Sequence, residues 1–148
     1  MSELIIRPMT EADIPVLCLA DGGETPENRE CFERYLGWQE QDKDCVFLLA
    51  FSQGQLAGHL FVFYHDCPSG REGIDLPRLA NLLVYPDFRN RGVAKKLMME
   101  GERLAAAFCD RVFLTAVSNS AVEQTYERWG YRPFEAAGDE VVLIKQLK

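Results

Sequence analysis

The sequence lacks the patterns that mark metal sites and disulfide frameworks. Its 148 residues include two histidines, and there is no HExxH motif. The five cysteines are odd in number and no two have CxxC spacing, so neither a structural zinc site nor a disulfide network is expected. We therefore predict a protein without a bound metal, in which the cysteines pack as small apolar side chains.

The sequence also has no apolar run near the roughly 18 to 20 residues that a membrane-spanning helix needs. The N-terminal segment MSELIIRPMTEAD carries an acid at Glu3 and has no cationic region followed by an apolar stretch. It therefore does not resemble a signal peptide. These features predict a cytoplasmic protein that does not associate with membranes.

Basic residues are too few for a general nucleic-acid-binding surface. The chain has 16 Lys and Arg against 23 Asp and Glu, which gives a formal net charge of −7. Because nucleic-acid binding depends on neutralising phosphates, we expect no nucleic-acid partner. The negative charge is compatible with a cationic substrate, but acidic proteins are common and the charge alone does not select one.

The pattern of apolar and turn residues predicts one domain over residues 1–148, enough chain for a single core. Strands are predicted near residues 4–8, on both sides of a turn at 52–55, and at 78–85, 111–117 and 141–147; helices near 11–20, 26–36, 92–108 and 120–130. With two strands at the end, the order is βααβββαβαββ. Because the strand at 78–85 is mostly apolar, it is expected to be buried on both faces. The order predicts a mixed α/β or α+β fold, not a doubly wound one.

The segment RNRGVAKK (residues 89–96) is the most informative local feature, because it joins a predicted strand to a predicted helix. A helix start has about four unpartnered N–H groups and a partial positive charge. Gly92 lets a ligand approach the backbone, and Arg89 and Arg91 suit phosphate. The Walker A and dinucleotide patterns are absent. The turn therefore favours a phosphate or pyrophosphate, with an ordinary solvated turn as the alternative.

Together with its surroundings, this turn resembles the GNAT superfamily of N-acetyltransferases. Arg89-Asn90-Arg91-Gly92-Val93-Ala94 matches the family's acetyl-coenzyme A loop, which reads Arg/Gln-x-x-Gly-x-Gly/Ala. The preceding LLVYPDF, the following NSAVEQTYERWGYRPF and the N-terminal IRPMTEADIPVL are similar to family segments in the same order. The resemblance thus covers nearly the whole chain.

The resemblance implies both a fold and a co-substrate. The fold is a central mixed, mostly antiparallel sheet of six to seven strands flanked by helices, and the co-substrate is acetyl-CoA. The turn would hold the pyrophosphate, the strand end would pair with the pantetheine arm, and family members often form homodimers. The implied binding residues are Leu82, Leu83, Val84, Arg89, Asn90, Arg91, Gly92, Val93, Ala94, Lys95, Asn119 and Tyr126.

Acetyl transfer to an amine needs a neutral amine, a polarised carbonyl and a proton for the departing thiolate. By its position, Tyr126 is similar to the family's general acid. A phenol with a pKa near 10 and a thiol near 8.5 are close enough to exchange a proton. The alternative for Tyr126 is a core aromatic residue packed against its own helix.

The general base is left open by the sequence. Many relatives carry a carboxylate near the start of the strand before the turn, where this chain has Arg78 and Asn81. The leading candidates are Glu72 and Asp75, and further candidates are Asp66, His59 and His65.

The acceptor side in the family is lined by segments that correspond to residues 21–43 and 66–77. These segments are rich in acids, namely Glu24, Glu27, Glu30, Glu33, Glu40, Asp42, Glu72 and Asp75. A cationic amine is therefore favoured, with a solvated acidic face as the alternative. The resemblance implies an acetyl-CoA-dependent N-acetyltransferase that acts on a primary amine of a small molecule or peptide by direct attack in a ternary complex. A non-catalytic acetyl-CoA- or CoA-binding module is the alternative, and a nucleotide in the same turn is disfavoured.

Overall fold

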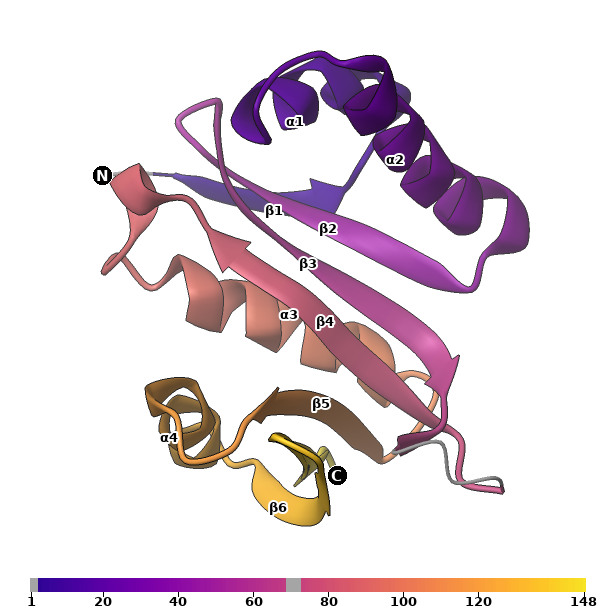
Figure 1. The fold of residues 1–148 in the computed structure, drawn as a ribbon, viewed down its shortest axis with the longest axis vertical. Coiled ribbons are helices and arrows are strands. Elements are labelled where there is room, and N and C mark those ends of the chain that lie inside the picture. Colours follow the sequence, from indigo (N-terminus) through magenta and orange to yellow (C-terminus); the bar gives the residue numbers. More distant parts are fainter. Residues whose placement is uncertain (1–2, 69–72) are drawn as a thin grey trace. The chain divides into compact units, whose positions relative to one another are not determined.

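The computed structural model describes residues 3–68 and 73–148, and Figure 1 shows its arrangement of helices and strands. The elements are β1 (Leu4–Pro8), α1 (Ile14–Ala20), α2 (Pro26–Gly37), β2 (Cys45–Ser52), β3 (Gln55–Asp66), β4 (Leu76–Val84), α3 (Val93–Ala106), β5 (Arg111–Val117), α4 (Ala121–Arg128), β6 (Arg132–Ala137) and β7 (Glu140–Gln146). This is the predicted order of elements.

The described strands form a sheet with the order β1-β2-β3-β4-β5-β7-β6. The pairs β1–β2, β5–β7 and β6–β7 are antiparallel, whereas β4 and β5 are parallel. The predicted mixed, mostly antiparallel sheet flanked by helices is therefore confirmed. The turn predicted at residues 52–55 joins β2 and β3, with Gln53 and Gly54 both at positive φ, as a tight hairpin turn requires.

The chain divides into two compact units. Unit 1 comprises Met1–Phe61 and Asn81–Glu100, and unit 2 comprises Val62–Ala80 and Gly101–Lys148. Three elements, namely β3, β4 and α3, are each divided between the two units.

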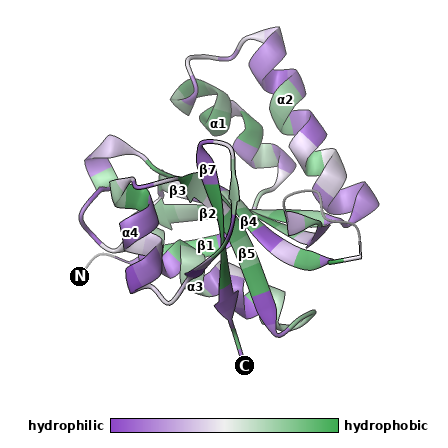
Figure 2. Ribbon diagram, turned by 60° about the horizontal axis from the view of Figure 1, so that its bottom comes forward, coloured by the Kyte–Doolittle hydropathy of each residue, from purple (hydrophilic) through white to green (hydrophobic). Residues whose placement is uncertain are grey.

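In unit 1, helices cover both faces of the strands. Figures 1 and 2 show α1 and α2 on one face and α3 on the other. Successive residues of β3 confirm this, because a Cβ at Gly58 would lie 3.4 Å from Leu97 of α3, while the ring of His59 lies 5.0 Å from that of Phe47 on the other side. The strand β2 is buried along most of its length because its sequence CVFLLAFS is almost wholly apolar.

The start of α1 is held by a buried carboxylate. Asp13 accepts hydrogen bonds from the Thr10 N–H (2.7 Å) and hydroxyl (3.0 Å), and from both guanidinium nitrogens of Arg7 (2.8 and 2.9 Å). Burial acts to raise the pKa of Asp13, but these bonds outweigh it and lower the pKa. A short 3-10 turn at Glu11–Asp13 precedes the α-helix, so the helix predicted from residue 11 begins with a tighter turn.

In unit 2, β7 lies between β5 and β6 and completes a small core. The buried residues Leu76, Phe113 and Val142 form one cluster of it, and Figure 2 shows β5 as mainly hydrophobic. The predicted cap of α4 is present, since the Ser120 hydroxyl accepts from the Glu123 N–H at 3.1 Å. Gly130 follows the helix at φ 100°, as a C-terminal cap requires.

A partly buried polar network joins α3 to the C-terminal strands of unit 2. The hydroxyl of Tyr131, whose residue is fully buried, donates to Glu102 at 2.7 Å, and the Lys145 ammonium donates to the same carboxylate at 3.0 Å. Burial, together with the negative charge of Glu102, raises the pKa of Tyr131. The phenol therefore stays protonated and remains a donor.

We expect Glu102→Ala to lower the free energy of unfolding by about 1–3 kcal/mol, because it leaves a buried hydroxyl without its acceptor. Tyr131→Phe removes that hydroxyl and is the matched control. The double variant should lose less stability than the sum of the two single-variant losses, because both substitutions remove the same hydrogen bond. Urea denaturation measures all three values, and strictly additive losses would show that the two groups are not coupled.

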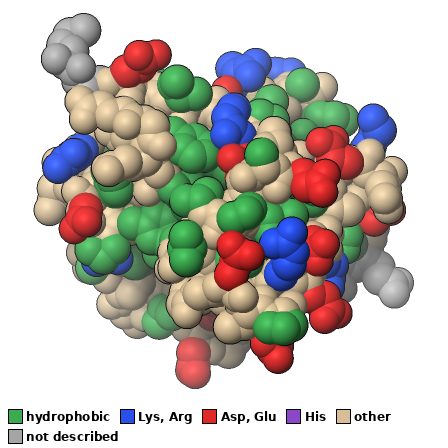
Figure 3. Space-filling model, turned by 90° about the horizontal axis from the view of Figure 1, so that it is seen from above, with side chains coloured by type: hydrophobic (Ala, Val, Ile, Leu, Met, Phe, Trp, Pro, Cys, Tyr) green, Lys and Arg blue, Asp and Glu red, His purple; other side chains and the backbone are tan. Residues whose placement is uncertain are grey.

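The surface carries charges of both signs. In the space-filling view of Figure 3, acidic and basic side chains are scattered among hydrophobic ones on the face drawn. Within residues 3–68 and 73–148, no helix is both long and apolar enough to cross a membrane.

Candidate functional site

The second half of β4 is open, which corrects the prediction that this strand is buried on both faces. Leu76 and Leu79 are buried, but from Asn81 onward exposure alternates and Leu83 is 38% exposed. Asn81 has φ 55°, a left-handed conformation that is rare inside a strand. Such a residue bends the strand and re-aims its side chains, as a β-bulge does. The apolar residues at the end of β4 therefore border a cavity instead of a closed core.

The backbone of β4 contacts β3 closely, whereas its described ladder with β5 is short. The parallel ladder with β5 pairs Arg78 with Phe113, and within the described residues no pair of this ladder falls on Leu82–Val84. On the β3 side the contact is close, because a Cβ built on Gly58 would lie 2.5 Å from the Leu83 carbonyl oxygen. A side chain at position 58 would therefore force the backbone of β3 or β4 to move.

The turn after β4 leads directly into the start of α3. Asn90 and Gly92 both have positive φ (64° and 80°), and a Cβ on Gly92 would meet no atom within 4 Å. The first backbone bond of α3 runs from the Lys96 N–H to the Gly92 carbonyl at 3.1 Å. The N–H groups of residues 93–95 thus have no acceptor in the preceding turn. This open backbone at a helix start has the chemistry of a phosphate site.

The side chains of the turn have different roles. Arg89 Nε donates to the Val84 carbonyl at 3.0 Å and so ties the turn to the end of β4. The Arg91 guanidinium lies 5.7 Å from the ring centroid of Phe88 and is exposed. Val93 is buried, so only its backbone can face a ligand. Most of the predicted binding residues belong to unit 1. They are Leu82, Leu83, Val84, Arg89, Asn90, Arg91, Gly92, Val93, Ala94 and Lys95.

The other two predicted residues, Asn119 and Tyr126, belong to unit 2. Asn119 is exposed, has φ 61°, and donates its N–H to Glu123 at 2.7 Å. The Tyr126 ring lies 5.9 Å from the rings of both Trp129 and Tyr131, and burial raises its pKa. Tyr126 is half-buried, so it packs as an aromatic residue while keeping a protonated hydroxyl.

The carboxylates predicted as bases contact a histidine or an arginine, or lie outside the described residues. Asp75 Oδ2 lies 2.8 Å from His65 Nδ1, and both side chains are exposed. Asp66 pairs with Arg78 at 3.3 Å. Glu72 lies outside the described residues. The base role of Glu72 and Asp75 stays a prediction.

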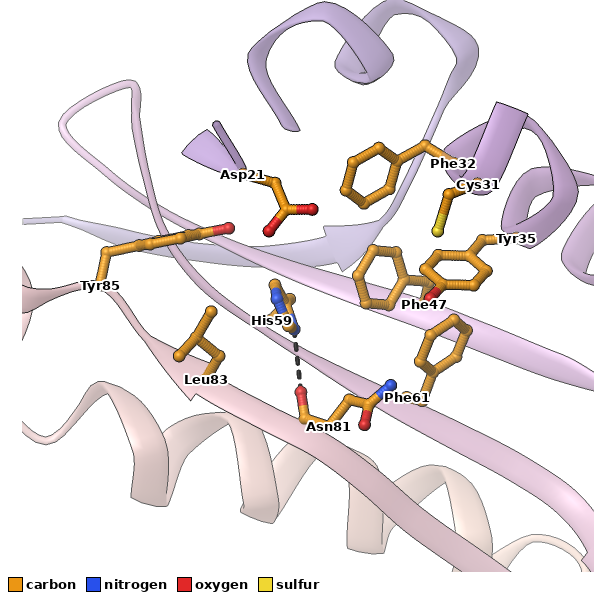
Figure 4. Close-up of a pocket in the computed structure, with 10 residues that line it drawn as sticks. All are labelled: Asp21, Cys31, Phe32, Tyr35, Phe47, His59, Phe61, Asn81, Leu83 and Tyr85. Atoms are coloured by element: carbon orange, nitrogen blue, oxygen red, sulfur yellow. Dashed lines mark hydrogen bonds between the residues drawn. The ribbon is translucent and has the colours of Figure 1, made fainter. Parts of the chain in front are cut away.

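Unit 1 contains a cavity of about 130 Å³ on the face of the strands covered by α1 and α2 (Figure 4). Its lining comes from the end of α1, from α2, β2 and β3, and from the open end of β4. The lining residues are Asp21, Cys31, Phe32, Tyr35, Phe47, His59, Phe61, Asn81, Leu83 and Tyr85. The sequence indicated the segment 21–43 and His59, but not that they meet at one cavity.

His59 is the central polar residue of this cavity. Its Nδ1 lies 2.9 Å from the Asn81 carbonyl oxygen (Figure 4). Because a carbonyl oxygen can only accept, Nδ1 carries the proton and Nε2 keeps its lone pair. Burial lowers the pKa of His59, an effect that the bond to Asn81 only partly opposes. His59 is therefore a neutral imidazole whose lone pair is on Nε2.

Aromatic rings form the rest of the wall. Around Tyr35, the ring centroids of Phe32, Phe47 and Phe61 lie at 5.7, 5.5 and 4.7 Å. A hydrogen bond with Cys31, together with burial, raises the pKa of Tyr35 to about 12. The sequence alone does not predict this cluster, because its members come from three separate elements.

The sequence matches the acetyltransferase (GNAT) family over residues 14–131. The chain belongs to the GNAT family. The resemblance seen in the sequence is therefore confirmed, and family membership supports acyltransferase activity in general. No curated protein sequence matches the chain.

Solved GNAT structures share this fold. A ribosomal-protein-alanine N-acetyltransferase from Brucella melitensis is 19% identical, with a TM-score of 0.74 over 97% of this chain and 99% of that one. A GNAT acetyltransferase from Streptococcus pneumoniae is 21% identical, with a TM-score of 0.70 over 99% and 100%. The PaiA N-acetyltransferase from Thermoplasma acidophilum, solved in complex with coenzyme A, is 16% identical, with a TM-score of 0.68 over 97% and 99%.

The turn of unit 1 has the chemistry of an anion site, because it combines the start of a helix with exposed cations and has no side chain at Gly92. In the described part of the chain, no group of three or more His, Cys, Asp and Glu side chains is arranged to hold a metal ion.

Proposed function

We propose that this protein transfers the acetyl group of acetyl-CoA to a primary amine in a ternary complex. The observation that carries the proposal is the junction of β4 and α3. There an open strand end, Leu82–Val84, leads within a few residues to the unpartnered N–H groups at the start of a helix. An extended arm can pair with such a strand end while its phosphates bind the helix start.

The proposed binding residues divide by chemistry. The backbone of residues 92–95 and the side chains of Arg89, Arg91 and Lys95 bind the pyrophosphate. The backbone of Leu82–Val84 binds the pantetheine arm, and an N–H near Val84 polarises the thioester carbonyl. Asn119 is proposed as a further contact of the arm on the basis of the family pattern.

In the proposed reaction, the neutral amine attacks the thioester carbonyl and the carbon–sulfur bond breaks. The departing thiolate gains a proton and the nitrogen loses one. Because the amine attacks the thioester directly, no covalent enzyme intermediate is needed. We assign the proton donor to Tyr126, which family position and a raised pKa support, because a phenol that stays protonated can give its proton to a thiolate.

We expect acetyl-CoA and CoA to raise the melting temperature by about 5–10 °C at roughly 100 times the dissociation constant, which corresponds to about 2.7 kcal/mol. ADP and NADH should give smaller shifts, because they lack the pantetheine arm. Differential scanning fluorimetry measures the shifts. The same shift with all four ligands would contradict a site built for acetyl-CoA.

We also expect Gly92→Ala to weaken acetyl-CoA binding by about tenfold, or about 1.4 kcal/mol, because a methyl group intrudes where phosphate approaches. Gly54→Ala is the matched control, since Gly54 also has φ 80° and also has open space around a built Cβ. Both variants should lose similar stability through backbone strain. Equal acetyl-CoA affinity in the two variants would show that the turn at Gly92 is not the phosphate site.

A non-catalytic CoA-binding module is the second candidate. It is favoured by Arg78 and Asn81 at the positions where relatives often carry a carboxylate. Thiol release with a panel of amines separates the two candidates. Binding of acetyl-CoA without release of CoA for any amine would support the second.

A further inference from the structure

The cavity of unit 1 has the size and the walls of a site for a small molecule. Its volume, about 130 Å³, is close to the ~150 Å³ cavity that holds a benzene molecule in a protein core. Phe32, Tyr35, Phe47, Phe61 and Tyr85 supply aromatic surface. These walls suit a compact apolar body, not a long polyamine or an oligosaccharide.

The polar groups of the cavity suit a cation. Asp21, at the C-terminal end of α1, points its carboxylate into the cavity above the ring of His59 (Figure 4). Among the described residues that line the cavity there is no Lys or Arg. With His59 neutral, the cavity therefore carries a net negative charge, and the faces of its aromatic rings also attract an ammonium group.

We propose that this cavity binds the acceptor, a small primary amine with an apolar body of about one ring, and that His59 Nε2 takes the proton from its ammonium group. The inference rests on the proposed function, because it names the substrate class and the base of that reaction. Asp21 holds the ammonium by charge, while the aromatic residues hold its body.

The positions of the groups around His59 explain why it is the base. The titratable residues that share the cavity are Asp21, Cys31, Tyr35 and Tyr85. Tyr35 and Tyr85 have raised pKa values and stay protonated, so neither accepts a proton near neutral pH. Nδ1 of His59 is bonded to the Asn81 carbonyl, which fixes the ring and leaves Nε2 as the acceptor.

The protons balance over the whole reaction. The ammonium gives one proton to Nε2 and becomes a neutral amine, which attacks the thioester carbonyl. As the carbon–sulfur bond breaks, the nitrogen loses a second proton and the thiolate gains one. The imidazolium then releases its proton to solvent, so the products are the acetamide, CoA and one proton.

The test uses the full chain with acetyl-CoA and two amines, phenethylamine and spermidine. We expect kcat/KM to be at least tenfold higher for phenethylamine. His59→Gln should lower kcat by about 10²-fold or more without changing the melting shift produced by acetyl-CoA. Asp21→Asn should mainly raise KM for the amine. Met99→Ala, at an exposed position of α3, is the control and should retain activity.

The pH profile gives an independent readout. Wild-type kcat/KM should fall on acidification below about pH 6.5, because His59 must be neutral and its pKa lies below the ordinary value of 6.5. His59→Gln should lose this acidic limb. An unchanged limb, a preference for spermidine, or full activity of His59→Gln would each overturn the inference and leave the proposed function intact. Absence of an acetyl-CoA melting shift would overturn the proposed function itself.

Discussion

Tyr126→Phe is expected to lower kcat for acetyl transfer by about 10²- to 10⁴-fold, while the melting shift produced by acetyl-CoA is retained. The substitution removes one hydroxyl and keeps the ring, which packs 5.9 Å from Trp129 and from Tyr131. Burial raises the pKa of Tyr126, so at neutral pH the wild-type hydroxyl is protonated and ready to donate. Without it, the thiolate must leave unprotonated or take a proton from water.

Trp129→Phe is the matched control for this variant, since it perturbs the same aromatic contact without removing the proposed donor. Steady-state thiol release gives kcat and KM for both proteins. Equal kcat for Tyr126→Phe and wild type would show that Tyr126 is a packing residue, the alternative that its ring contacts support.

The second large effect is expected from Gly58→Ala in β3, which should lower the free energy of unfolding by about 1–3 kcal/mol. A Cβ at this position would lie 2.5 Å from the Leu83 carbonyl oxygen and 3.3 Å from the Val84 Cα. Both are backbone atoms, so β4 itself must move. Because Leu83 and Val84 are the proposed contacts of the pantetheine arm, acetyl-CoA affinity should fall together with stability.

Gly37→Ala in α2 provides the control, because a Cβ there would meet no atom within 4 Å. This helical change should be neutral or stabilise by up to about 1 kcal/mol. Guanidinium denaturation and acetyl-CoA titration report both effects. Equal stability of the two variants would mean that the β3–β4 contact yields easily, and that the glycine has no structural role.

Much of the fold could be predicted because local signals and burial agree along the chain. The hairpin turn at Gln53-Gly54, the amphipathic α3 and the Ser120 cap each have a short-range cause. The open end of β4 was predicted wrongly. Its apolar residues read as a buried strand, and the left-handed conformation at Asn81 has no sequence signature in a single chain.

The candidate site also has one part that the sequence indicates and another part that it does not. The turn at residues 89–95 could be proposed as a phosphate site from sequence because its members are contiguous, and Tyr126 as the acid because it stands at family spacing; both roles stay predictions. The cavity could not be identified, since it brings together Asp21, Tyr35 and His59 from separate elements. His59 stood among several candidate bases, and its place in the cavity together with its bond to the Asn81 carbonyl distinguishes it. Homodimer formation and a cytoplasmic location stay predictions.

The position of β7 between β5 and β6 has a consequence for biosynthesis. β6 is made before β7, yet its described ladder is with β7 alone, and β5 likewise gains its antiparallel neighbour only then. On the ribosome, the strand edges of unit 2 therefore stay unpaired until β7 has been synthesised. The segments of unit 1, in contrast, have all been synthesised once the chain reaches Glu100. A nascent chain stalled before residue 140 would expose the edge of β5. Such a stalled chain is the form in which this protein would most readily require a chaperone.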